Sequence, residues 1–270
     1  MKKIAVCFFG ITRSLKFTHQ SIKDNVLAPA RASGEVKVFA HFFNQKIVRN
    51  RRTHEDSELD LNDRSLLPLD FLDIEEPDEC LDLYDFDLLK NYGDTRRDGF
   101  QSFKNLVHAL HSQKRVGLAA LSWKPDLVIF ARPDLLYHDS LGAVLNDIEK
   151  DNLDNIISPG VTIPDWQHWR GGYNDRFAIC AGQAAISAYS QRVDMMHRYC
   201  IEMREPIHSE SLLRYSLNRA GISVSYMPVR ASRVRANGRV QAENFGESKI
   251  DHIKTCIRKA RRKLLNIPEL

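Results

Sequence analysis

The first 43 residues constrain the fold most, because an apolar run, an amphipathic helix and a second apolar run follow one another there. Residues 3–9 form a continuous apolar run ended by Gly10, which is typical of a buried strand. Residues 18–31 have helical spacing, Gly34 stands where a helix stops, and residues 36–43 form the second apolar run. Strand, helix and strand in this order predict a right-handed crossover between parallel strands, with the following loops at one sheet edge.

The rest of the chain continues the alternation. Further strands are predicted over residues 71–74, 126–137, 155–161, 177–180 and 223–229, and further helices over residues 103–121, 184–203 and 209–219. Residues 44–66 are polar and are expected to form an exposed excursion. The sequence therefore predicts an α/β fold with a mostly parallel sheet flanked by helices. We expect one domain over residues 1–245 and a helical tail over residues 246–270.

Charge is segregated along the chain. Residues 54–98 hold 16 acidic and 4 basic side chains, a net charge of −12. Because the whole chain has a net charge of +4, the other residues together carry +16. Within residues 254–263 there are six Lys or Arg and no acid, and apolar side chains recur there at helical spacing. This pattern predicts a basic amphipathic helix that either contacts anionic lipid or packs on its own domain. Five cysteines without a C-x-x-C pair favour a cytoplasmic protein, peripheral on the inner face of the membrane if the tail binds lipid.

Two loops after predicted strands carry groups suited to phosphate. In residues 10–14, Gly10 offers a turn, and Thr12 and Arg13 offer donors for a diphosphate, although a plain turn with a surface arginine has the same sequence. Arg132-Pro133-Asp134 closes the strongest apolar run. At a strand's carboxyl end Asp134 can hold a divalent cation or a sugar hydroxyl and Arg132 can face phosphate. The alternative is an ion pair between these two side chains.

Five segments together carry a family resemblance. They are Phe9-Gly10-Ile11-Thr12-Arg13, Val38-Phe39-Ala40-His41, Gln101-Ser102, the run from Pro125 to Asp134, and Asn174-Asp175-Arg176-Phe177-Ala178-Ile179. In this succession the chain resembles bacterial surface-polysaccharide (capsule or lipopolysaccharide) glycosyltransferases of the GT-A, Rossmann-like fold over about residues 3–235. The resemblance implies transfer of a sugar from a nucleotide-diphosphate donor to a hydroxyl of a glycan or glycolipid acceptor.

The resemblance also implies roles for particular residues. In the family an Asp-x-Asp ends this strand and binds Mn²⁺ or Mg²⁺, but here Arg132 replaces the first carboxylate. Metal binding at Asp134 is therefore left open, with Arg132 as a partial replacement for the cation. The residues expected near the sugar or acceptor are Trp166, Trp169, Tyr173, Asn174 and His208. The alternative for the three aromatic rings is packing in the core or in a loop.

Glu210 and Asp175 are the candidates for a general base that takes the acceptor's proton, which is needed only if the reaction inverts configuration. Glu210 also has a purely structural explanation. It stands in the first turn of a predicted helix that Ser209 would cap, where the helix dipole favours an acidic side chain. Arg233 and Arg235, in an arginine-rich segment with Arg230 and Arg239, are expected to clamp the diphosphate.

Other functions remain open. The loop at residues 10–14 superficially resembles the phosphate loop of sulfotransferases, but Leu15-Lys16-Phe17 follows in place of Gly-Thr-Thr. A non-catalytic protein that binds RNA or anionic lipid would use the basic part of the chain, yet no nucleic-acid module is evident and none is expected as a partner. His108 and His111 are three apart on a predicted helix and can share a metal, but the sequence indicates no third ligand.

Overall fold

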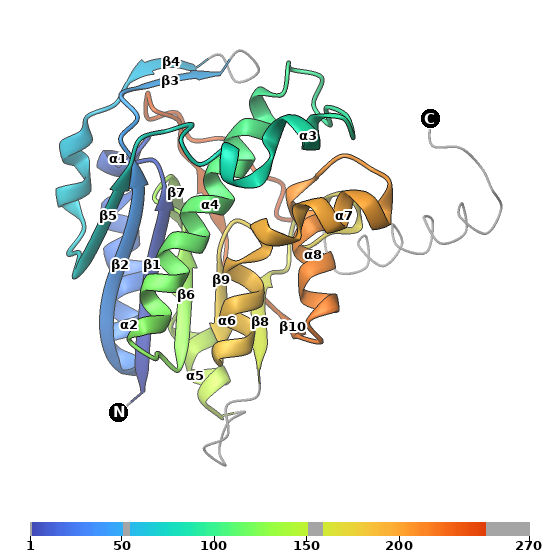
Figure 1. Ribbon diagram of the computed structural model, residues 1–270. Coiled ribbons are helices and arrows are strands. Elements are labelled where there is room, and N and C mark those ends of the chain that lie inside the picture. Colours follow the sequence, from blue (N-terminus) through green and yellow to red (C-terminus); the bar gives the residue numbers. More distant parts are fainter. Residues whose placement is uncertain (1, 51–54, 151–158, 247–270) are drawn as a thin grey trace.

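The computed structural model describes residues 2–50, 55–150 and 159–246. Its centre is a seven-stranded sheet in the order β10-β8-β9-β6-β1-β2-β5 (Figure 1). The strands are β1 (Lys3–Gly10), β2 (Glu35–Phe43), β5 (Phe71–Glu75), β6 (Leu127–Ala131), β8 (Gly160–Pro164), β9 (Ala178–Ala181) and β10 (Ser223–Met227). All neighbours are parallel except β9, which is antiparallel to β6 and β8. The predicted α/β class with a mostly parallel sheet flanked by helices is confirmed.

Two layers of helices cover the sheet. Behind it lie α1 (Leu15–Ile22), α2 (Ala28–Ser33) and α5 (Gly142–Lys150); in front lie α4 (Gln101–Ser122) and α6 (Gln183–Ser190), with α3 (Phe86–Lys90), α7 (Met196–Met203) and α8 (Ser209–Arg219) beyond (Figure 1). Alternate side chains of β1 enter different cores: Ile4 and Val6 pack on the first layer, and Ala5 and Cys7 on the second. The sheet is thus buried on both faces, as the continuous apolar strands require.

The predicted helix over residues 18–31 is interrupted by a π-helical turn at Lys23–Leu27. Pro29 has no N–H to give to the carbonyl of Asn25, which instead accepts from the backbone N–H of Leu141 at 2.9 Å. The predicted helix over residues 184–203 is also broken, into α6, a 3₁₀ turn and α7. There the buried Arg192 side chain donates to the Tyr189 carbonyl at 2.7 Å.

Two other predictions differ in extent, and one is confirmed. The run over residues 126–137 is interrupted at Arg132-Pro133-Asp134 as expected, and its second part, β7 (Leu135–Tyr137), pairs with β11 (Ala231–Arg233). The strand predicted over residues 155–161 begins later, at Gly160, and residues 155–158 lie outside the described chain. The excursion over residues 44–66 contains a hairpin, β3 (Ile47–Asn50) with β4 (Glu55–Glu58), and a 3₁₀ helix, Leu61–Leu66.

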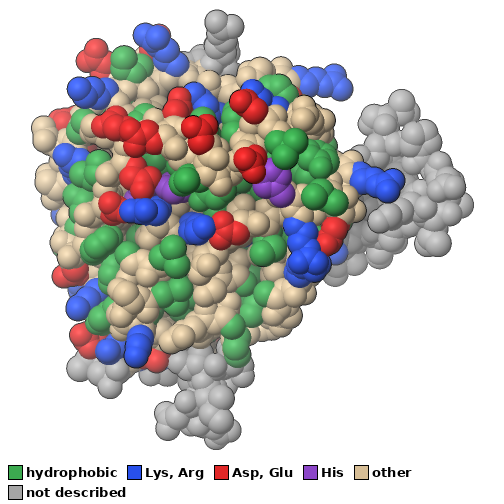
Figure 2. All heavy atoms as spheres, in the orientation of Figure 1, with side chains coloured by type: hydrophobic (Ala, Val, Ile, Leu, Met, Phe, Trp, Pro, Cys, Tyr) green, Lys and Arg blue, Asp and Glu red, His purple; other side chains and the backbone are tan. Residues whose placement is uncertain are grey.

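Acidic side chains gather over the upper part of the face in Figure 2, near β5 and α3, as expected from the acidic segment 54–98. The expected basic tail, residues 246–270, lies outside the described residues from position 247 on, so the division into two domains stays a prediction. None of the described helices is both long enough and apolar enough to span a bilayer.

Candidate active site

A cavity of about 680 Å³ opens at the carboxyl ends of β1 and β6. Its wall comes from segments far apart in the sequence, including the loop after β1, the loop after β6, the start of α4, the start of α8 and the segment after β11. Eight arginines and four carboxylates line it. The carboxyl edge of an open parallel sheet is where ligands bind in such folds, and this lining favours an anion.

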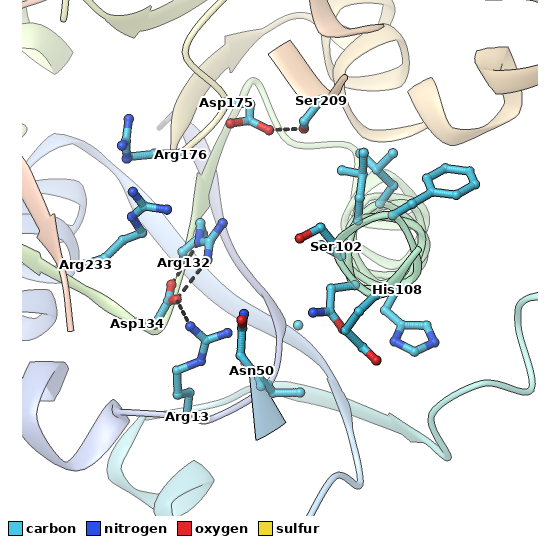
Figure 3. Close-up of a pocket in the computed structure, with 18 of the residues that line it drawn as sticks. Arg13, Asn50, Ser102, His108, Arg132, Asp134, Asp175, Arg176, Ser209 and Arg233 are labelled. Carbon is cyan, nitrogen blue, oxygen red and sulfur yellow. Dashed lines mark hydrogen bonds and ion pairs between the residues drawn. The ribbon is translucent and has the colours of Figure 1, made fainter. Parts of the chain in front are cut away.

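The loop after β6 contributes an ion pair. Arg132 donates to both carboxylate oxygens of Asp134, from Nε and from Nη2, each at 2.8 Å (Figure 3). Arg13, from the loop after β1, approaches the same carboxylate with Nη1 at 3.7 Å from Oδ2. Burial acts to raise the pKa of Asp134, but Arg132, followed by Arg13 and Arg233, holds it well below its ordinary value. Asp134 is therefore an ionised anchor for guanidinium groups.

Two further arginines enter from the chain after β10. Arg235 donates to Glu55 of the hairpin at 3.1 Å, and Arg233 donates to Glu243 at 3.1 Å. Glu55 also lies 3.8 Å from Arg13 Nη1, so one carboxylate of the hairpin contacts both Arg13 and Arg235.

Arg176 completes this group from the loop before β9. Its guanidinium donates to Glu243 at 3.0 Å and lies 4.7 Å from the ring centre of Trp166. Its Nε and Nη1 are buried and have no hydrogen-bond partner among the described residues. We call Arg13, Arg132, Arg176, Arg233 and Arg235 the arginine cluster. Five guanidiniums face three carboxylates, Glu55, Asp134 and Glu243, so two positive charges are left in excess.

Asp175 and Ser209 face each other on the opposite side of the cavity (Figure 3). The Ser209 hydroxyl donates to Asp175, and Arg192 lies 4.0 Å from the same carboxylate oxygen. Burial acts to raise the pKa of Asp175, but Arg192, the Ser209 hydroxyl and Arg132 hold it below its ordinary value. Ser209 does not cap α8 with its side chain, because its hydroxyl is directed to Asp175.

Glu210 is a buried carboxyl of the cavity, with 6% of its surface exposed. It accepts a hydrogen bond from the backbone N–H of Trp169. Burial and the neighbouring Asp175 raise its pKa well above the ordinary value, against that hydrogen bond and the charges of Arg176 and Arg233. Two adjacent carboxyls whose pKa values are pushed apart are a common arrangement for acid–base chemistry.

Most residues predicted for the site line this one cavity: Gly10, Arg13, Arg132, Asp134, Trp169, Asp175, His208, Glu210, Arg233 and Arg235. Four others do not: Thr12, Trp166, Tyr173 and Asn174. Arg230 and Arg239 are also absent from its wall, and Arg230 pairs with Asp139 at 2.8 Å instead.

The expectation that Trp166 offers its ring to a sugar is wrong. The ring is 1% exposed in the core, and its indole N–H donates to the carbonyl of Val229 at 2.9 Å. Asn174 is fully buried, and its side-chain amide bonds within the protein. It donates to the Trp166 carbonyl at 2.6 Å and accepts from the Arg176 backbone N–H at 3.0 Å. Both residues thus position Arg176.

Three arginines that line the cavity were not predicted as site residues: Arg49, Arg96 and Arg192. Arg176 belongs to the segment that the resemblance placed near the sugar or acceptor, and it does line the cavity, but the sequence did not indicate that it would join the other arginines. Arg192 lay inside a predicted continuous helix, where an isolated arginine usually faces solvent. A break in that helix was the missing signal, since the break turns Arg192 inward to 2% exposure.

The divalent cation implied by the GT-A resemblance does not fit at Asp134. Both carboxylate oxygens already accept from Arg132, and the residue two positions earlier is that arginine rather than a second acid. A cation here would also face Arg13. The positive charge on this side of the cavity is supplied by the arginine cluster.

No family model matches this chain, and no curated protein matches it. Among solved structures, mouse xyloside xylosyltransferase 1 in its apo form is similar, with 11% sequence identity and a TM-score of 0.42. The similarity covers 84% of this chain and 85% of that one. A likeness this distant is too weak to transfer a function.

Proposed function

We propose that this protein is a glycosyltransferase that binds the diphosphate of a nucleotide sugar in the arginine cluster. The observation that carries the proposal is the excess of two positive charges in that cluster, at the carboxyl edge of a parallel sheet. A diphosphate brings the complementary negative charge and enough oxygens to accept from several guanidiniums. The cavity volume of about 680 Å³ suits a ligand of nucleotide size.

The arginines would act on the departing group. As the bond between the anomeric carbon and the diphosphate oxygen breaks, negative charge grows on that oxygen. Guanidiniums that are already fixed by Asp134, Glu55 and Glu243 can stabilise this charge without reorganising. This role needs no metal at Asp134, in keeping with the ion pair that holds its carboxylate.

Glu210 is the proposed base, with Asp175 as its rival. In an inverting transfer the acceptor oxygen forms a bond to the anomeric carbon, the diphosphate leaves, and the acceptor's proton passes to a carboxylate. A raised pKa makes Glu210 a better proton acceptor than Asp175, whose pKa is lowered. A retaining transfer would need no such base.

The exposed Trp169 and the buried His208 line the cavity and are proposed to contact the sugar or the acceptor. The proposed acceptor is a glycan or glycolipid hydroxyl in surface-polysaccharide biosynthesis. The residues 246–270 are proposed to contact anionic lipid, which would place a cytoplasmic enzyme near a lipid-linked acceptor.

The test is to incubate the full chain with a panel of nucleotide sugars, with and without Mn²⁺, and to measure released nucleoside diphosphate. We expect hydrolysis of one donor in the panel, and stabilisation against heat by its nucleoside diphosphate. Adenosine 3′,5′-bisphosphate serves as the comparison ligand. Stabilisation by that compound, with no donor hydrolysed, would instead favour the sulfotransferase-like alternative.

A further inference from the structure

Two histidines and a glutamate form a cluster between the sheet and α4. His41 comes from β2, Glu75 from the end of β5 and His111 from α4. His111 Nε2 lies 2.7 Å from Glu75 Oε2, and His41 Nε2 lies 3.5 Å from the same oxygen. One atom from each of the three residues falls within 4.8 Å of the others. His111 thus meets His41, not His108, which pairs with Asp78 at 2.9 Å.

The hydrogen bonds of His41 fix which of its nitrogens carries the hydrogen. The Ser112 hydroxyl donates its one hydrogen to the His41 carbonyl at 2.8 Å, and its oxygen lies 2.8 Å from His41 Nδ1. We therefore assign the ring hydrogen to Nδ1, which donates to Ser112. Nε2 is left with a lone pair that faces the Glu75 carboxylate. This nitrogen is buried and has no hydrogen-bond partner within the described part of the chain.

A lone pair held against a carboxylate is unfavourable unless a cation lies between them. A metal ion accepts the lone pair and neutralises the carboxylate at the same time.

The surrounding residues hold the three side chains as metal ligands are usually held. Tyr84 OH lies 2.8 Å from His111 Nδ1, and a hydroxyl can accept there once Nε2 binds a metal. Arg115 Nε lies 3.3 Å from Glu75 Oε1, which leaves Oε2 directed at the histidines. Hydrogen bonds of this kind to the outer atoms of the ligands orient them and fix their tautomers.

The geometry points to a zinc-class metal site formed by His41, Glu75 and His111, separate from the arginine cluster. Two imidazole nitrogens and one carboxylate oxygen suit Zn²⁺ better than Mg²⁺ or Ca²⁺, which prefer oxygen ligands. Ligand atoms about 2.1 Å from a tetrahedral zinc lie roughly 3.4 Å apart, close to the spacing of His41 and Glu75. The fourth position would go to water or to Asp73, whose Oδ2 lies 3.9 Å from His41 Nε2.

The ion would tie three elements together beside the cavity. It would link the edge strand β5 and its neighbour β2 to α4. Ser112, which holds the His41 ring, also accepts from the backbone N–H of Gly10 at 2.7 Å, and Gly10 lines the cavity. We assign the metal a structural role, because the histidines and the glutamate do not themselves line the cavity.

The test measures zinc binding by the full chain, without an affinity tag, after removal of metal with a chelator. Zn²⁺ is titrated against a chromophoric chelator, and the melting temperature is followed with and without Zn²⁺. Co²⁺ replaces Zn²⁺ in a parallel titration, in which a tetrahedral site gives visible absorption. The variants are Glu75→Gln, which keeps the shape of the side chain, and His111→Gln. His108→Gln is the matched control, one turn away on α4.

We expect one Zn²⁺ per chain and a zinc-dependent rise in melting temperature in the wild type and in His108→Gln. Glu75→Gln and His111→Gln should lose at least about ten-fold in affinity, together with the cobalt absorption. The absence of stoichiometric zinc in the wild type would overturn the proposal. So would equal binding by wild type and both ligand variants, or an equal loss in His108→Gln. None of these readouts depends on glycosyl transfer, so they stand apart from the test of the proposed function.

Discussion

Arg132 donates from Nε and Nη2 to the two carboxylate oxygens of Asp134, two residues further along the chain, at 2.8 Å each. The intervening Pro133 also belongs to the cavity wall, and its carbonyl accepts from the Thr18 hydroxyl at 2.6 Å. The ion pair is therefore held on a fixed turn between β6 and β7.

Replacing Asp134 with Asn should destabilise the fold at neutral pH, because Arg132 would lose its counter-charge. Breaking a buried ion pair typically costs about 3–5 kcal/mol, and we expect about 3 kcal/mol because Arg132 is partly exposed. The pKa of Asp134 is lowered by folding, so its contribution is present above the unfolded pKa of about 3.9 and is lost as pH falls further. Urea unfolding from pH 7 to pH 3 should show the wild type and variant converging. A constant difference would contradict the assignment.

Replacing Arg13 with Ala should weaken binding of the donor's nucleoside diphosphate. A charge-assisted hydrogen bond contributes about 1.5–3 kcal/mol, so we expect a loss of about ten- to hundred-fold in Kd. The control is Arg230→Ala, an arginine that pairs with Asp139 and does not line the cavity. Calorimetric titration measures the Kd of the nucleoside diphosphate for both variants. Equal losses in the two variants would indicate a general charge effect.

Nucleoside diphosphate binding should be nearly independent of Mn²⁺, because the arginine cluster supplies the positive charge and Asp134 is engaged by Arg132. We expect Kd values with and without added Mn²⁺ to agree within about three-fold. The measurement adds the ion without using a chelator, so the proposed zinc site is not disturbed. A requirement for Mn²⁺ would show that the ion pair opens when ligand binds.

Replacing Glu210 with Gln should reduce turnover by about 10²- to 10⁴-fold if it is the base, with little change in nucleoside diphosphate affinity. Because its pKa is raised, wild-type turnover should climb as pH rises above the ordinary Glu value of about 4.3, and Glu210→Gln should lose this limb. Near-normal turnover of Glu210→Gln would exclude Glu210 as the base, so that either Asp175 is the base or the reaction retains configuration.

The same substitution has an effect on stability. The protonated Glu210 carboxyl contributes stability that is present below the unfolded pKa and is lost as pH rises through the raised folded pKa. The unfolding free energy of the wild type should therefore decline relative to Glu210→Gln as pH increases. Parallel curves would contradict the raised pKa.

Replacing Gly172 with Ala should disrupt the contact between the Trp169 turn and α8. A Cβ at Gly172 would collide with the backbone of Glu210 and Ser211, which cannot move as a side chain can. Overpacking of this kind costs at least about 1–3 kcal/mol. The control is Gly142→Ala at the start of α5, where the added Cβ has ordinary contacts and should change stability by about 0.5 kcal/mol or stabilise. Thermal melts compare the two.

Local pattern predicted most of the elements. The buried strand at residues 3–9 and the helix at residues 209–219 were recognisable because strand and helix have different apolar periods. The run over residues 126–137 is interrupted at Arg132-Pro133-Asp134 as the local sequence predicted, whereas the predicted helix 184–203 is broken where Arg192 is buried. At that break Arg192 donates to Gln113, 79 positions away in the sequence, and this distant contact overrides the local pattern.

The sequence by itself determined the α/β order and placed Arg13 and Asp134 at the carboxyl ends of their strands, because parallel crossovers bring such ends to one edge. Only the tertiary structure decided where each side chain points. It put Trp166 in the core, turned Arg176 and Arg192 into the cavity, and brought His41 to His111 across 70 positions of sequence. Whether a side chain is buried, and which residue it contacts, depends on which faces of separate elements meet. The apolar periodicity within one element does not indicate which other element packs against it.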